Sequence, residues 1–500
     1  MNNNLDSLKT LLHEFEKKSG LIGVKHEFQK TSKQHVLVIY IPHPTNRHFE
    51  ILEASRTALH NIDQEEIIAT IKQKASEDSL EGPEARLLLK TLAESQNINR
   101  FSFEYDFMSR YTRSVSGAES QIVSNANHVV LGRRGAGKST LLLYALNDRK
   151  QDDQSCVWID MQVYSRRDDP QVAADIFREI FDQIFSELNP SLEYNPMITA
   201  LRSPNITEVE IRKLLPTIRR EISRFARAGS NLFLFLDDFH VLSKDLQPIV
   251  LDFIYACARG NRVFLKISAI ETLTQTYDQS SKIGLEIPQD AQYIRLDYNL
   301  TSPDRATAHI QAILDSHSRY AGLKSVRSLC TSADVLPRLT WVAAGVPRDA
   351  INLFAQAMTK ASVEGRKKVS VSNVNVAASE TISSKLRDLD ADASQEADQL
   401  KALLEEIRDF CVSKQRKNAF LIENTTENMN FNKFLNLVNL RILHVITEGI
   451  TVGDAGRKFM GLILDYGFYT GVRAAQSVDL FAKKGGKITY KELRKLPIFK

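Results

Sequence analysis

The chain is poor in the features that hold small secreted domains together or anchor proteins in membranes. It has four cysteines among 500 residues, and they stand far apart without a CxxC pair, which excludes a disulfide framework and a zinc knuckle. No apolar run approaches the roughly 20 residues that cross a bilayer, and the start MNNNLDSLKT lacks the basic and apolar regions of a signal peptide. We therefore expect a cytoplasmic protein with no membrane partner.

A large surplus of charge is also absent. Lysine and arginine number 65 against 61 aspartates and glutamates, with 43% hydrophobic residues, which is typical of globular proteins and excludes a disordered polyelectrolyte. Basic residues nevertheless gather in 483–500, where only Glu492 is acidic. The basic residues there are Lys483, Lys484, Lys487, Lys491, Arg494, Lys495 and Lys500. This tail predicts nonspecific contact with the phosphates of DNA or RNA, with a solvated tail as the alternative.

The pattern along the chain changes several times, as expected for a length of several domains at about 150 residues each. Residues 1–104 indicate an α+β interaction domain, with an amphipathic helix at 5–15, a strand at 36–42 and helices near 48–60, 64–76 and 84–95. Residues 301–385 are helical. Residues 386–500 begin with an acidic linker or helix end and continue with apolar strand and helix patterns.

Residues 105–300 alternate short apolar strands with helices. The strands are expected at 128–132, 156–161, 232–236, 262–270 and 291–296, and the helices at 138–149, 170–187, 207–228 and 245–259. Strands alternating with helices of this length predict an α/β fold, a parallel sheet with helices on its faces.

A phosphate-binding motif follows the first of these strands. The segment GRRGAGKST matches G-x-x-x-x-G-K-[ST] and stands between a strand and a helix. Glycines let backbone amides and the helix N-terminus approach phosphate, Lys138 is suited to the β and γ oxygens, and Ser139 to Mg²⁺. Arg133 and Arg134 contact phosphate or a partner, or are solvated. The predicted nucleotide-binding residues are Gly132, Arg133, Arg134, Gly135, Ala136, Gly137, Lys138, Ser139 and Thr140.

Two acids end a later strand, in NLFLFLDDFH. A nucleoside triphosphatase needs a carboxylate at a strand end for hydrated magnesium and a second acid for the attacking water. Asp237 is predicted to be the magnesium acid, together with Ser139. Asp238 is predicted to orient the water, at a position where a longer glutamate is usual.

The order of these motifs resembles the AAA+ ATPases, in particular the origin-recognition and initiator type, over residues 105–382. The resemblance implies a P-loop ATPase core at 105–300 that binds ATP with Mg²⁺, a helical lid at 301–385 and a winged-helix module at 386–500. It also implies a polar sensor, Ser268 in RVFLKISAI, and a second sensor, Arg348 in GVPRDAINLF, beside catalytic Lys138, Asp237 and Asp238.

The chain departs from the family in three places. Ala269 stands where many relatives have asparagine, residues 271–292 hold no arginine and only Lys282 as a cation, and helices 170–187 and 207–228 lengthen the core as an insertion. Signal-transducing STAND NTPases, with a P-loop and a paired-aspartate strand, are similar too.

The resemblance implies a regulatory ATPase that switches its assembly or conformation with nucleotide, alone or with a partner protein. Its setting would be a DNA transaction or a bacterial antiphage defence complex. The alternative is a STAND-like interaction module that nucleotide stabilises with little turnover.

Overall fold

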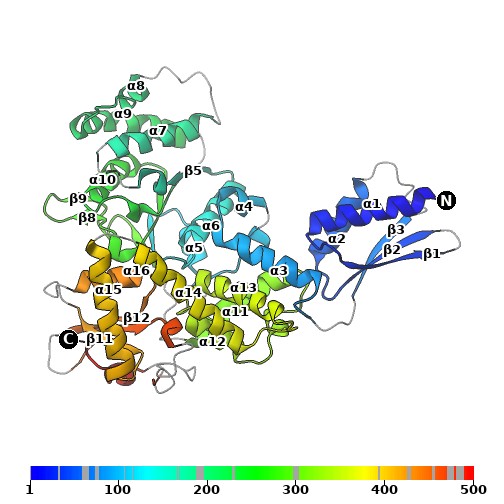
Figure 1. Ribbon diagram of the computed structural model, residues 1–500. Helices are drawn as coiled ribbons and strands as arrows, with labels where there is room; N and C mark the ends of the chain where they lie inside the picture. Colours follow the sequence, from blue (N-terminus) through cyan, green and yellow to red (C-terminus); the bar gives the residue numbers. More distant parts are fainter. Residues whose placement is uncertain are drawn as a thin grey trace. The chain divides into compact units, whose positions relative to one another are not determined.

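The computed structural model describes residues 2–499 apart from short stretches (Figure 1). The stretches outside the description are 32–33, 59–66, 74–77, 106, 115, 166, 168, 170, 187–195, 228–230, 297–302, 392–394, 425–429, 453–456, 470–477 and 480–488. Two compact units divide the chain, Met1–Thr112 with Tyr298–Lys500, and Arg113–Asp297. No helix of the described residues is both long and apolar enough to cross a membrane.

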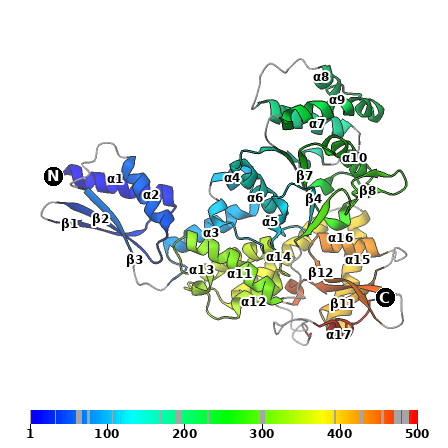
Figure 2. The same ribbon diagram turned by 180° about the vertical axis from the view of Figure 1, so that it is seen from behind.

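The unit at 113–297 is built on a parallel sheet. Its strands are β4 (His128–Leu131), β5 (Ser155–Asp160), β6 (Leu232–Asp237), β7 (Val263–Ala269) and β10 (Gln292–Arg295). They lie in the order β10-β4-β7-β6-β5, and every pair is parallel. Figure 2 shows β4 and β7 side by side. The predicted α/β class and parallel sheet are confirmed.

The central strands are apolar on both sides because helices cover both faces of the sheet. In β6, Leu232, Leu234 and Leu236 belong to one buried cluster, which includes residues of α7 and α10. Phe233 and Phe235 belong to another, with α5 and α6. Since successive side chains of a strand point to opposite faces, the run LFLFL fills two cores at once. The helices of this unit are α5 (Ala118–Ile122), α6 (Lys138–Gln151), α7 (Gln171–Ser186), α8 (Pro196–Leu201), α9 (Glu208–Arg227) and α10 (Leu246–Ala258).

Residues 271–292 form a small hairpin. Strands β8 (Tyr277–Asp278) and β9 (Ile283–Gly284) pair antiparallel, and Lys282 stands in their turn with a φ of 58°. Lys282 is exposed. The only cation of this segment therefore lies on a surface turn.

The N-terminal part of the other unit contains a strand where a helix was predicted. Its elements are α1 (Asn2–Ser19), β1 (Lys25–Lys30), β2 (His35–Ile41), α2 (Asn46–Thr57) and β3 (Ile67–Gln73). The expected helix at 64–76 is wrong, because β3 pairs in parallel with β2 over its whole length. Ile67 and Ile71 are both buried, and a spacing of four places two residues on one face of a strand as well as of a helix.

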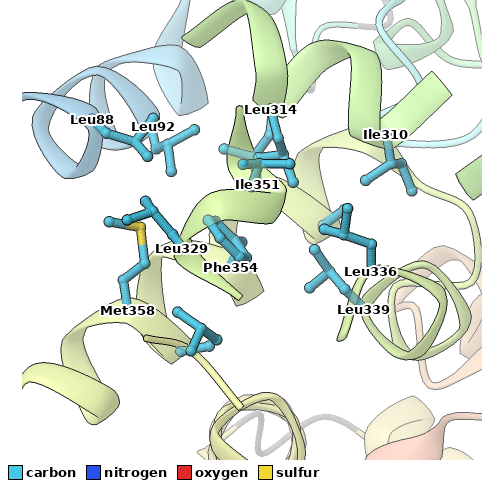
Figure 3. Packing of buried hydrophobic residues seen from close by; sticks show 14 of the residues in the cluster. Leu88, Leu92, Ile310, Leu314, Leu329, Leu336, Leu339, Ile351, Phe354 and Met358 are labelled. Carbon is cyan, nitrogen blue, oxygen red and sulfur yellow. The ribbon is translucent and has the colours of Figure 1, made fainter. Parts of the chain in front are cut away.

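Helices from two distant stretches share one core in this unit. They are α3 (Pro83–Glu94), α11 (Pro303–Tyr320), α12 (Val335–Val342) and α13 (Pro347–Val363). Figure 3 shows Leu88 and Leu92 of α3 facing Leu314 and Ile351 across the buried cluster. Phe354 lies at its centre and is 0% exposed.

The last part of the chain forms a second small sheet. Helix α14 (Val371–Ala391) continues past the predicted lid end at 385, and its Leu389 packs in the C-terminal core. The other elements are α15 (Gln395–Arg408), β11 (Ala419–Glu423), α16 (Phe431–Asn439), β12 (Leu443–Thr451), β13 (Lys458–Leu464) and α17 (Tyr490–Leu493). The sheet order β11-β13-β12 is antiparallel, and the predicted winged-helix module at 386–500 stays a prediction.

Truncation of Phe354 tests the core shown in Figure 3. We expect Phe354→Ala to lower the free energy of unfolding of this unit by about 3–5 kcal/mol, because it removes a buried ring and leaves a cavity. Each unit holds one of the two tryptophans, so Trp341 fluorescence during urea unfolding in a Trp158→Phe background reports this unit alone. Val363→Ala on the same helix, at a side chain 81% exposed, should change the free energy by less than about 0.5 kcal/mol. Equal effects of the two changes would contradict the described core.

Candidate functional site

The phosphate motif forms a loop between a buried strand and a long helix. Strand β4 ends at Leu131 and α6 begins at Lys138, with Gly135 and Gly137 at φ of 81° and 95°. Residues other than glycine rarely adopt such backbone angles. A Cβ atom added to Gly137 would meet no atom within 4 Å, so the backbone angle of this residue, and not a lack of space, favours glycine here.

The side chain of Lys138 lies against this loop. It is largely buried, and its ammonium group donates to the carbonyl oxygen of Arg133 at 3.3 Å. Ser139 and Thr140 are half-buried, and Arg134 is exposed. The loop therefore brings together a glycine-rich turn, a helix N-terminus and a lysine, which are the features that bind phosphate.

The strand order separates this loop from the acids by one strand. Strand β7 lies between β4 and β6, with Ser268 opposite Val130 of β4. Since neighbouring strands are about 5 Å apart, the loop and the end of β6 are separated by roughly 10 Å.

Asp237 is held by hydroxyl groups. The Ser268 hydroxyl donates to its Oδ1 at 2.5 Å, and the Ser139 hydroxyl is near enough to lower the pKa of this acid. Burial, and then the charge of Asp238, raise the pKa of Asp237 to about 6, against the two hydroxyls and Lys138, which lower it. The two predicted magnesium ligands thus lie together, and they supply the oxygen donors that Mg²⁺ prefers.

Asp238 has a different environment. Its backbone is left-handed, with φ of 57° and ψ of 41°, a conformation that aspartate tolerates better than most residues. Its amide donates to the Ser268 oxygen at 2.8 Å, and its side chain is 30% exposed. Ser268 therefore binds both acids, and its one hydroxyl proton points to Asp237 and not into the space above the sheet.

Two further residues lie at the acids without having been predicted. Gln162, in the turn η3 (Met161–Tyr164), donates from Nε2 to Asp238 Oδ2 at 3.2 Å. His240, in η5 (Phe239–Val241), has its Nδ1 at 3.9 Å from Asp238 Oδ1. A histidine directly after Asp237, Asp238 and Phe239 could have been recognised in the sequence. Gln162 belongs to no motif, and it contacts Asp238 only because β5 and β6 are neighbouring strands.

Arg348 belongs to the other unit. It lies exposed in the first turn of α13, and its neighbour Asp349 pairs with Arg441. Its predicted contact with nucleotide stays a prediction.

A model of the family described as ORC-CDC6-like matches residues 177–338. The matched segment begins in α7, includes Asp237, Asp238 and Ser268, and ends in α12. The predicted resemblance to origin-recognition AAA+ ATPases is confirmed. No curated protein matches the sequence.

Several solved structures resemble this chain at low identity. The ORC2 protein of Aeropyrum pernix is 14% identical, with a TM-score of 0.40 over 74% of this chain and 93% of that one. A Walker-type ATPase of Pyrococcus abyssi is 14% identical, with a TM-score of 0.41 over 74% and 99%. A chain of Drosophila ORC bound to DNA is 14% identical, with a TM-score of 0.37 over 82% and 93%.

Substitution of Asp237, the predicted magnesium acid, tests the electrostatics of the unit at 113–297. Because the pKa of Asp237 is raised from 3.8 to about 6, folding is penalised by its ionisation, and the penalty grows above pH 3.8 and is complete above pH 6. We expect Asp237→Asn to raise the free energy of unfolding of the nucleotide-free protein at pH 7.5 by up to about 3 kcal/mol. The gain should shrink at pH 4.5.

Trp158 fluorescence during urea unfolding, in a Trp341→Phe background, measures this unit. Asp182→Asn, at an exposed acid of α7, is the matched control and should change the free energy by less than about 0.5 kcal/mol. A gain that is the same at pH 4.5 and pH 7.5 would exclude ionisation of Asp237 as its cause.

Proposed function

We propose that the chain binds ATP with Mg²⁺, hydrolyses it, and uses the two nucleotide states as a conformational or assembly switch. The observation that carries this proposal is that the glycine-rich loop before Lys138 and Ser139 stands one strand away from Asp237 in the parallel sheet. These residues come from the end of β6 and the start of α6, and they join the phosphate loop to the acids.

Each residue of the candidate site has a proposed role that fits its chemistry. Backbone amides of the loop and Lys138 bind the phosphates, while Ser139 and Asp237 would hold Mg²⁺, which supplies positive charge to the phosphate oxygens. Asp238, partly exposed beside the largely buried Asp237, is the acid suited to accept a hydrogen bond from the attacking water. Ser268 fixes both acids through its single hydroxyl.

The ATPase activity has a direct test. Lys138→Ala and Asp237→Ala should each abolish Mg²⁺-dependent phosphate release, because one removes the phosphate contact and the other the magnesium acid. The release of phosphate from ATP by purified protein is the measurement, and Lys150→Ala, an exposed residue near the end of the same helix, is the control. Turnover that survives both substitutions would refute the assignment.

A module with little turnover remains the second candidate. Residues 271–292 contain no arginine that could act on the nucleotide of a neighbouring subunit, and Lys282 lies on a surface turn. Purified protein that carries nucleotide and hydrolyses little ATP, with DNA present or absent, would support this STAND-like function.

We also propose that the C-terminal end contacts nucleic acid. Lys483, Lys484, Lys487 and Lys500 of the predicted basic tail lie outside the described residues. Lys491, Arg494 and Lys495 are exposed on and just after α17. Leu493 and Leu496 are buried, and the backbone of Phe499 bonds to Leu421, so residues 489–499 form a packed basic surface and not a solvated tail.

Charge substitution therefore tests this surface better than truncation, which would remove Phe499. The triple change Lys491→Gln, Arg494→Gln and Lys495→Gln should weaken binding to duplex DNA. It should also reduce the slope of log affinity against log salt by about 0.9 for each DNA phosphate that the protein no longer neutralises. Fluorescence anisotropy of labelled DNA at several salt concentrations gives both quantities.

The control for this experiment removes the same charge elsewhere. Lys9→Gln, Lys17→Gln and Lys25→Gln change three exposed lysines of the N-terminal part. Equal reductions of affinity in the two triple variants would assign the effect to net charge alone and contradict the proposed surface. Self-association, a partner protein for residues 1–104, and the choice between a DNA transaction and antiphage defence stay predictions.

A further inference from the structure

An exposed aromatic ring stands beside the basic side chains of the C-terminal surface, and the proposals above give it no role. Tyr490 is the first residue of α17, and it is 68% exposed. Its side chain makes no hydrogen bond or ring contact with the described residues. A tyrosine ring carries a large apolar face, and the face of Tyr490 is therefore available to a ligand.

The ring and the cations belong to the same short stretch of helix. The amide of Arg494 donates to the carbonyl oxygen of Tyr490 at 3.0 Å, so these two residues are one helical turn apart. Lys491 and Lys495 have the same spacing. Because residues four apart lie on one face of a helix, Tyr490 and the three cations occupy two neighbouring rows of one exposed surface.

The acid of this stretch is engaged in capping the helix. Glu492 Oε2 accepts from the amide and from the hydroxyl of Thr489, at 2.8 and 2.9 Å. None of the cations Lys491, Arg494 and Lys495 forms a salt bridge with the described residues. The positive charge of the surface is therefore left to an anion from outside the chain.

The C-terminal core holds this surface in place. The backbone of Leu421 in β11 donates to the carbonyl oxygen of Pro497 and accepts from the amide of Phe499, both at 2.8 Å. The centroid of the Phe499 ring lies within 6 Å of those of three buried or partly buried rings, Phe410, Phe420 and Phe434. A ligand that binds an anchored surface loses less free energy to the ordering of the chain than one that binds a loose end.

We propose that this surface binds single-stranded DNA or RNA in preference to duplex, with an unpaired base stacked on Tyr490 and its phosphates on the three cations. In a duplex the face of each base is covered by the next base pair, whereas an unpaired base can stack on an aromatic ring. The phosphates are present in both forms. An acidic peptide would offer anions to the cations but no base to the ring. The inference rests on the proposed contact with nucleic acid and names its substrate class.

Binding of the full chain to labelled oligonucleotides tests this proposal by fluorescence anisotropy, with oligo-dT, oligo-U and a duplex as probes. Tyr490→Ala should weaken binding to single strands by about 5- to 150-fold, the effect of losing one stacked base, and leave the affinity for duplex unchanged. The slope of log affinity against log salt should also stay the same, because tyrosine neutralises no phosphate. Tyr490→Phe keeps the ring and should bind as the wild type does. The arms with oligo-dT and oligo-U distinguish DNA from RNA.

Phe101→Ala is the matched control. Phe101 is 67% exposed and also lies beside an arginine, with the guanidinium carbon of Arg100 at 5.3 Å from its ring centroid. This change should leave all affinities unaltered.

Three results would overturn the inference. They are equal affinity of the wild type for single strands and duplex, single-strand binding by Tyr490→Ala that equals that of the wild type, and an equal loss of polyglutamate binding in that variant, which would assign the surface to an acidic polypeptide. Absence of binding to every nucleic acid by the wild type would instead overturn the proposed contact itself.

Discussion

The position of β7 between β4 and β6 is the constraint on which the candidate site depends. If β6 paired directly with β4, the acids would stand about 5 Å from the phosphate loop, too close for a terminal phosphate and a water. Because β7 lies between β4 and β6, the spacing between these two strands doubles, and Ser268 of β7 lies between the loop and the acids. Its hydroxyl donates to Asp237 and accepts from the amide of Asp238, so one side chain sets the position of both acids.

Much of this geometry could be predicted from the sequence. The five strands of the core begin and end within two residues of the predicted positions, because apolar runs of four to seven residues between long helices have few other interpretations. The phosphate loop can be predicted equally well, since phosphate binding needs glycine, lysine and serine at fixed spacing. Chain order alone, however, does not determine which strands are neighbours, and the contact of Gln162 with Asp238 depends on that order.

The parts that the sequence did not predict are those decided by tertiary packing. Residues 67–73 carry isoleucines at a spacing that suits a helix or a strand, and pairing with β2 decides in favour of the strand. In the same way, the pattern along the chain places α3 in the N-terminal domain, but its leucines pack against α11 and α13. Amphipathic helices show which face is buried without showing the partner.

The charges of the candidate site are unfavourable in the absence of a ligand, and this explains their arrangement. Two acids are adjacent, one of them largely buried, while burial, together with the charges of Lys138 and Arg134, keeps the imidazole of His240 neutral. At neutral pH the raised pKa of Asp237 opposes folding by up to about 3 kcal/mol, whereas the lowered pKa of His240 costs stability only below pH 6.5. Magnesium would relieve the repulsion between the acids, and phosphates would compensate the cations. A ligand that binds only the folded state also stabilises it, so the stability of the unit at 113–297 should depend on nucleotide through the same residues that would carry out hydrolysis. The two apolar cores on the faces of its sheet offset the free-energy cost of burying these charged groups.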